Sequence, residues 1–166
     1  MLPPMPQHLQ LLVIAAIVGS ALITGVLFAF SLVVMRALQE LPPATGMAAM
    51  QRINVLILTP LFLALFMGTA LLCVGIAVIG FRGLPSSGAA WLLVGAACYL
   101  AGPFAVTMAF NVPLNNRLAA AAASRADAVW PPYVAAWVRW NHVRTAIGTT
   151  GIAALAWGLA LAARGA

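Results

Sequence analysis

Residues 53–81 read INVLILTPLFLALFMGTALLCVGIAVIGF, a run without one charged side chain. The hydrocarbon core of a bilayer is about 30 Å thick, and a helix needs about 20 predominantly apolar residues to cross it. This run is long enough for such a helix. It indicates a chain built to fold in lipid.

Three further charge-free runs of similar length flank it: Leu9–Met35, Ala89–Phe110 and Thr145–Ala163. The chain is 64% hydrophobic and 6% charged, whereas an average soluble domain is about 25% charged. The first run is too long for the apolar part of a secretory signal and lacks a basic flank, which favours a retained helix. We predict an all-α fold, an integral membrane antiparallel four-helix bundle forming a single domain over residues 1–166, with spans at about 9–35, 53–81, 89–110 and 133–163.

Charge predicts how the chain sits in the bilayer. The net charge of +6 comes from eight arginines and no lysine, scattered singly, which argues against a nucleic-acid partner. Four antiparallel spans would leave Arg82 and Arg164 on one side, and would collect five arginines on the other: Arg36, Arg52, Arg117, Arg125 and Arg139. By the positive-inside rule, we expect a plasma-membrane protein with the loops after the first and third helices in the cytoplasm.

Prolines suggest where the helices bend or begin. The segment Met47–Arg52 reads as an amphipathic lead-in to the second helix, and Pro60 should kink that helix early. Pro113 should kink or end the third helix, because its ring clashes with the carbonyl four residues back. Proline is tolerated in a first helical turn, so we expect the last helix to begin at about Pro132.

Small residues predict close helix packing. Pairs of glycines seven residues apart lie on one helical face and let helices approach in lipid. These seams could join helices within one chain or between two copies, so a homo-oligomer is possible. The pairs are Gly68 and Gly75, Gly95 and Gly102, and Gly151 and Gly158.

A polar and aromatic stripe on the last helix is the first candidate functional feature. Tyr133, Trp137, Trp140, Asn141 and Arg144 recur at spacings of three and four, which places them on one helical face. An arginine and an asparagine among aromatic rings, at the edge of a charge-free run, are unusual in a membrane helix.

Further polar residues should converge on this stripe from the other helices. Thr107, Asn111 and Asn115 end the third helix, and antiparallel connectivity brings Arg36 and Asn54 to the same membrane level. Unsatisfied polar groups near hydrocarbon cost several kcal/mol. The cluster therefore either forms an interhelical hydrogen-bond network with an interfacial aromatic belt or lines a wetted cavity. The presence of so many polar residues at one level favours a ligand site, since ionisable residues inside a bundle are functional candidates.

Metal and acid–base chemistry have little support in the sequence. His142 lies about 100° around the helix from Asn141, and it is the only plausible proton acceptor near neutral pH at this level. His8 belongs to the opposite membrane face, so the two histidines cannot share a haem. Glu40 and Asp127 are the only carboxylates and fall in predicted loops, which leaves no ligand set for a di-iron or zinc site.

Four segments resemble the anthrone oxygenase-like family of small four-helix membrane proteins, much of which is catalogued as a domain of unknown function. They are Phe28–Leu38 (FAFSLVVMRAL), Met50–Asn54 (MQRIN), Asn111–Asn115 (NVPLN) and Trp137–Arg144 (WVRWNHVR). The resemblance spans nearly the whole chain and implies a membrane oxidoreductase. In fungal polyketide pathways such enzymes oxidise the activated CH2 of an anthrone with molecular oxygen.

The resemblance also suggests roles for individual residues. An anthrone that loses a proton gives a carbanion able to reduce oxygen directly, so we expect no cofactor, with molecular oxygen as co-substrate. Asn141 and Arg144 would stabilise the oxyanion and His142 would take the proton. A small aromatic or hydrophobic ligand would bind at Asn54, Asn111, Asn115, Trp137, Trp140, Arg36 and Thr107.

Two alternatives remain open at this point. A scaffold or ligand-binding subunit would use the polar cluster only to lock the bundle, so replacing Arg144 would lower stability and leave ligand binding intact. A small-molecule transporter ranks third. Proton-coupled export needs a carboxylate within the membrane, and no predicted span contains one.

Overall fold

The computed structural model describes residues 5–83 and 88–164, and the regular structure in this part of the chain is helical. The first span is one continuous helical segment, whereas the predicted second span is divided between two separate helices. A short 3-10 turn, η3 (Ala123–Arg125), precedes the last helix. In chain order the remaining elements are α1 (Gln7–Ala29), η1 (Phe30–Val34), α2 (Met35–Gln39), α3 (Pro43–Leu56), α4 (Pro60–Phe81), α5 (Ala89–Tyr99), η2 (Leu100–Asn111), α6 (Val112–Ala119) and α7 (Ala126–Arg164).

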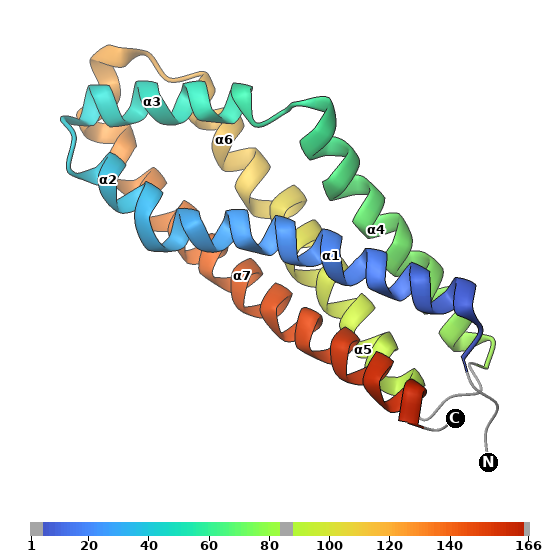
Figure 1. Ribbon diagram of the computed structural model, residues 1–166. Helices are drawn as coiled ribbons and strands as arrows, with labels where there is room; N and C mark the ends of the chain where they lie inside the picture. Colours follow the sequence, from blue (N-terminus) through green and yellow to red (C-terminus); the bar gives the residue numbers. More distant parts are fainter. Residues whose placement is uncertain (1–4, 84–87, 165–166) are drawn as a thin grey trace.

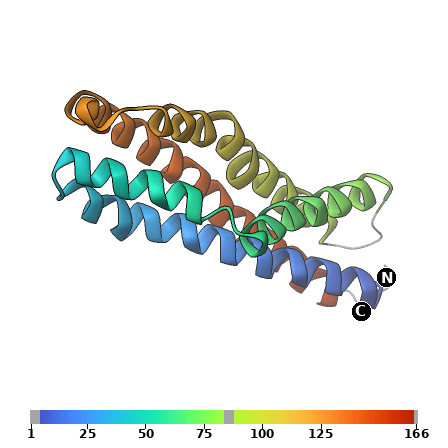
Figure 2. The same ribbon diagram turned by 90° about the horizontal axis from the view of Figure 1, so that it is seen from above.

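Within the described residues, four helical segments are long and apolar enough to cross a membrane: Gln7–Gln39, Pro60–Phe81, Ala89–Ala119 and Ala123–Ala163. They lie lengthwise against one another, and α1 begins at the end of the bundle where α7 stops (Figures 1 and 2). Helix α7 packs against α1, α5, η2 and α3. The chain is an integral membrane protein with a helical bundle fold, which confirms the predicted fold class.

The second span differs from the prediction. Pro60 does not kink a continuous helix. Instead, α3 ends at Leu56, and α4 begins at Pro60. Thr59 caps α4, because its hydroxyl accepts a hydrogen bond from the backbone N–H of Phe62 at 3.2 Å. A proline in the first helical turn loses no hydrogen bond there, which explains why the chain restarts at this point.

The third span does not end at Pro113, which was one of the two outcomes that the sequence allowed. The helix continues from Ala89 to Ala119, but residues Leu100–Asn111 adopt π-helical turns. The N–H of Val112 bonds to the carbonyl of Thr107, five residues back. These wider turns shift the carbonyls by one residue, which relieves the proline clash expected in an α-helix.

The last helix begins earlier than predicted, at Ala126, with Pro131 and Pro132 inside it. The early start is explained by packing, because Ala126 is 3% exposed and Trp130 is 4% exposed. Both belong to a second core, at the α2–α3 end of the bundle, together with Met47 and Met50. This core holds in place the N-terminal half of α7, which carries the polar stripe.

Glycines bring α5 and η2 against α7, so the predicted seam lies within one chain here. A Cβ on Gly95 would lie 2.5 Å from Cγ of Leu155 and 2.9 Å from the carbonyl oxygen of Gly151. Gly68, in contrast, has no heavy atom within 4 Å of such a Cβ.

Gly95→Ala is therefore expected to lower the free energy of unfolding by about 1–3 kcal/mol through overpacking. Gly68→Ala is the matched control and should be neutral or slightly stabilising, since alanine is the better helix former by about 1 kcal/mol. Thermal unfolding in detergent measures both. Equal effects of the two changes would contradict a tight α5–α7 contact.

Candidate functional site

A cavity of about 300 Å³ lies in the half of the bundle that contains α3 and α6 (Figure 1). Side chains from all four spans form its wall, and most of them are apolar or aromatic. A few polar groups on a largely apolar wall are typical of a small-molecule site. The polar side chains in the wall are Gln51, Asn54, Thr107, Asn115, Asn116 and Arg144.

Arg144 is the charged group of this cavity, and it is 6% exposed. Its Nε and Nη2 donate to Oδ1 of Asn141 at 3.0 and 2.8 Å. Its Nη1 donates to the hydroxyl of Thr107 at 2.7 Å, and its guanidinium lies 5.1 Å from the ring centre of Trp137. Each of these partners is neutral. Among the described residues the cation therefore lacks a counter-charge, although buried charges are normally paired.

Asn141 lies behind Arg144 and is fully buried. Its Nδ2 donates to the carbonyl of Leu27 at 2.8 Å and to the hydroxyl of Ser31 at 2.6 Å. Its Oδ1 accepts the two Arg144 bonds, so both ends of the amide are occupied. The Leu27 carbonyl lies just before the π-helical turn η1, which begins at Phe30, and it also accepts from the backbone N–H of Phe30. Asn141 is therefore a positioning residue for Arg144.

Trp137 forms an aromatic wall that is held in place from several directions. Its Nε1 donates to Oδ1 of Asn115 at 2.9 Å, and the hydroxyl of Tyr133 donates to the same oxygen at 2.9 Å. Nδ2 of Asn111 donates to the backbone carbonyl of Trp137 at 3.3 Å. Phe30 packs against the indole with ring centres 5.5 Å apart. A ring fixed in this way is preorganised to receive a flat ligand.

Asn54 adds an unused hydrogen-bond donor. Its Nδ2 is buried and makes no hydrogen bond of normal geometry in the part of the chain that the structure describes, although the side chain lies beside the hydroxyl of Tyr133. A buried donor without a partner costs about 1–3 kcal/mol. Together with the unpaired charge of Arg144, it gives the cavity an excess of donors, which suits a ligand rich in acceptor oxygens.

The sequence model of the anthrone oxygenase family matches residues 60–154, more than half of the chain. The chain belongs to the anthrone oxygenase family. No curated protein matches the sequence, and no solved structure matches it either. Within this anthrone oxygenase family member, the matched region contains the cavity residues Thr107, Asn115, Trp137 and Arg144. Asn54 precedes that region.

The structure brings together only part of the predicted site of this anthrone oxygenase family member. Asn54, Thr107, Asn115, Trp137 and Arg144 line the cavity. The other five predicted residues do not line it. Asn111 and Asn141 lie behind its wall as supports, while Arg36, Trp140 and His142 lie outside it.

The three outlying residues have identifiable reasons for their positions. Trp140 lies about 60° around the helix from Trp137, and it stacks on Phe110 with ring centres 3.6 Å apart. His142 lies about 100° around α7 from Asn141, and its Nδ1 lies 3.0 Å from the hydroxyl of Ser31. Arg36 borders the same outer groove. Only part of the predicted set therefore lines this cavity, because the spacing alone does not show which part of a stripe faces inward.

Some cavity residues were missed by the sequence reasoning. Phe30, Phe62 and Met50 line the wall, but as apolar residues in apolar helices they carry no signal. Ser31 bridges Asn141 and His142. Ser31 is one of three hydroxyl side chains in the apolar run of the first span, with Ser20 and Thr24, so the sequence did not single it out. Within residues 5–83 and 88–164, no three His, Cys, Asp or Glu side chains lie close enough to hold a metal ion.

Proposed function

We propose that this protein is a membrane oxidoreductase that oxidises a small planar hydroxyaromatic with molecular oxygen. The substrate would bind as an oxyanion in the cavity beside Arg144. The observation that carries the proposal is a buried arginine with only neutral partners, facing a cavity lined by Trp137. The family to which the chain belongs supports the reaction class.

The cavity's size supports the choice of ligand. Its volume of about 300 Å³ is at the lower end of the range for small-molecule sites, and it suits one flat molecule of two or three fused rings. Such a molecule can stack on the indole of Trp137 and place a ring oxygen between the guanidinium of Arg144 and the amide of Asn54. Aromatic stacking contributes about 0.5–1.5 kcal/mol beyond the burial of apolar area.

The proposed reaction requires few catalytic groups from the protein. A CH2 group that is made acidic by a carbonyl across the same ring loses a proton, and the resulting enolate reduces molecular oxygen. One oxygen atom replaces the two hydrogens of the CH2 group, and the other leaves as water. Arg144 and Asn54 would stabilise the oxygen on which the negative charge develops. A preorganised donor to such an oxygen can be worth a factor of about 10²–10³ in rate, and we expect the charged Arg144 to contribute most of this effect.

We propose a proton acceptor other than His142. His142 does not line the cavity, and neither of the two carboxylates does. We therefore expect the substrate to ionise with water as the acceptor, helped by the positive charge of Arg144. This restricts the substrates to compounds that enolise readily. We propose that no cofactor takes part.

The test is oxygen uptake by the detergent-purified protein with a hydroxylated anthrone. The Asn54→Leu variant, which removes the unpartnered donor and keeps the side-chain size, should raise KM about 10-fold, the equivalent of one hydrogen bond to a charged oxygen. The same change should raise thermal stability, because it removes an unsatisfied buried group. A gain in stability combined with a loss of function is typical of residues placed for binding.

Gln10→Leu is the matched control, since it replaces an amide at the opposite end of the bundle, where Gln10 bonds to the carbonyl of Met5. It should leave KM unchanged. Absent oxygen uptake in the wild type would refute the proposed reaction. A metal or chromophore that copurifies and is needed for uptake would refute the cofactor-free mechanism alone.

A further inference from the structure

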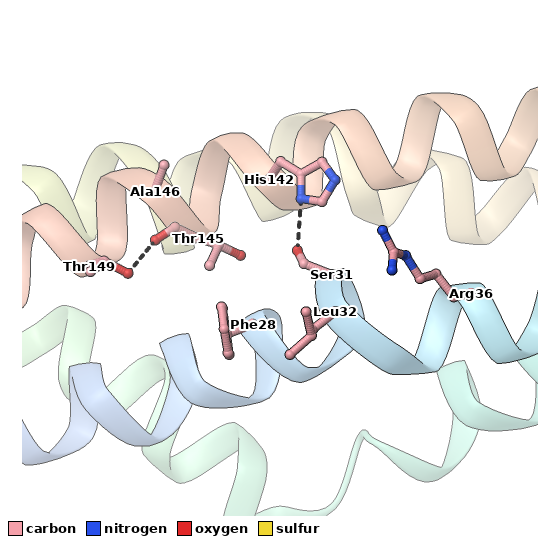
Figure 3. Close-up of a pocket in the computed structure, with 8 residues that line it drawn as sticks. All are labelled: Phe28, Ser31, Leu32, Arg36, His142, Thr145, Ala146 and Thr149. Atoms are coloured by element: carbon pink, nitrogen blue, oxygen red, sulfur yellow. Dashed lines mark hydrogen bonds between the residues drawn. The ribbon is translucent and has the colours of Figure 1, made fainter.

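A second hollow lies on the outer side of the bundle, between the first span and α7 (Figure 3). This outer groove has a volume of about 510 Å³. It is lined by Phe28, Ser31, Leu32, Arg36, His142, Thr145, Ala146 and Thr149. It is distinct from the cavity described above, because Asn141 and Ser31 lie between them. The proposed function does not use it.

The polar groups of the outer groove gather at one end. Arg36 and His142 extend toward the same space, and Phe28 and Thr149 lie at the other end (Figure 3). Ser31 holds His142 through Nδ1 at 3.0 Å, which leaves the other ring nitrogen available. Arg36 has no side-chain hydrogen bond or ion pair within residues 5–83 and 88–164. This end of the groove thus presents a cation without a counter-ion beside a histidine.

The charged and apolar parts of the groove lie at the depths of the headgroups and the acyl chains of one membrane leaflet. Arg36 directly follows the charge-free run of the first span, and His142 lies just before that of the last, so both lie at headgroup level. Phe28 is eight residues from Arg36 and Thr149 is seven from His142, which puts them about 12 and 10 Å deeper at 1.5 Å per residue. Phe28 and Leu32 are 55% and 51% exposed. The cationic end therefore faces the headgroups, and the apolar walls run into the hydrocarbon.

We propose that the outer groove binds one anionic phospholipid. Its phosphate would lie between Arg36 and His142, and the first part of one acyl chain would lie along Phe28, Leu32 and Ala146. Arginine matches the charge and the oxygen geometry of a phosphate, and basic residues at headgroup level attract anionic lipids. An apolar groove with a single cation at its headgroup end is complementary to a lipid with those two parts.

The test compares thermal unfolding of the full chain in detergent with added phosphatidylglycerol or phosphatidylcholine. A ligand that binds only the folded state raises Tm by an amount that grows with its concentration relative to its Kd. We expect phosphatidylglycerol to raise Tm at least about twice as much as phosphatidylcholine. Arg36→Gln should remove most of that difference, and because Arg36 is exposed, the variant should fold like the wild type.

Arg139→Gln is the matched control. Arg139 is also exposed and lies on α7 close to the level of His142, but it packs over Trp140, 5.4 Å from the ring centre, outside the groove. Its replacement should keep the lipid difference. Equal losses in the two variants would overturn the proposal in favour of general surface attraction. Equal shifts by both lipids would also overturn it, and so would a full shift produced by inorganic phosphate alone.

Discussion

Replacing Arg144 with glutamine is expected to lower kcat/KM for a hydroxylated anthrone by about 10²–10³-fold. The guanidinium is the one cation in the cavity wall, and removing a preorganised donor to a developing oxyanion costs about 3–4 kcal/mol. Glutamine keeps an amide that can donate to Oδ1 of Asn141. The fold should therefore survive, with Tm changed by less than about 4 °C, the equivalent of about 1 kcal/mol for a chain of this size.

Oxygen uptake and ligand-dependent melting together measure this effect. Arg144→Lys keeps the charge but cannot bond to Asn141 and Thr107 in the same geometry, so it should recover only part of the activity. Arg139→Gln should behave like the wild type. A scaffold protein would give the opposite pattern in Arg144→Gln, with lower stability and an unchanged ligand shift. That result would replace the enzyme proposal.

Asn141→Ala is expected to destabilise the protein more than any other change to the cavity. It leaves Nε and Nη2 of Arg144 and the carbonyl of Leu27 without side-chain partners in a buried region. Buried groups that lose their partners cost about 1–3 kcal/mol each. We expect a loss of about 3–5 kcal/mol, and hence a fall in Tm of about 10 °C, in a thermal melt.

Asn141→Asp separates the structural effect of this residue from its electrostatic effect. The carboxylate still accepts from Arg144, so we expect it to retain more stability than alanine. Its negative charge pairs with the guanidinium and removes the attraction for an anionic ligand. Ligand-dependent melting should therefore disappear in Asn141→Asp. An aspartate variant that still binds the anion would show that Arg144 is not the counter-charge.

The four apolar segments could be predicted from sequence because the bilayer imposes a length and a composition on each crossing helix. The stripe from Tyr133 to Arg144 was equally accessible, since a spacing of three and four residues fixes one face of a helix. Thr59-Pro60 also carried a usable signal. A capping residue followed by proline marks a helix start. The prediction of a kink at Pro60 considered only the backbone hydrogen bond that a proline removes.

Other features depend on tertiary packing and had no signal in the sequence. The π-helical turns η1 and η2 change the hydrogen-bond register without changing the apolar pattern, and they decide which carbonyls and side chains reach α7. The division of the polar residues between the cavity and the outer groove follows from angles of 60–100° around α7, as the positions of Trp140 and His142 show. Apolar wall residues such as Phe62 cannot be told from core residues until the helices are placed.

The division of the second span at Ile57–Thr59 affects how substrates should be supplied in any assay. Val26, Val55 and Leu58 line the cavity and are also 36%, 62% and 61% exposed, so the edge of the cavity merges with the apolar outer surface. A flat lipophilic compound dissolved in detergent or lipid can reach this edge without first entering water. Its effective concentration is then its mole fraction in the apolar phase, and kinetic constants compare fairly only at a fixed ratio of substrate to lipid.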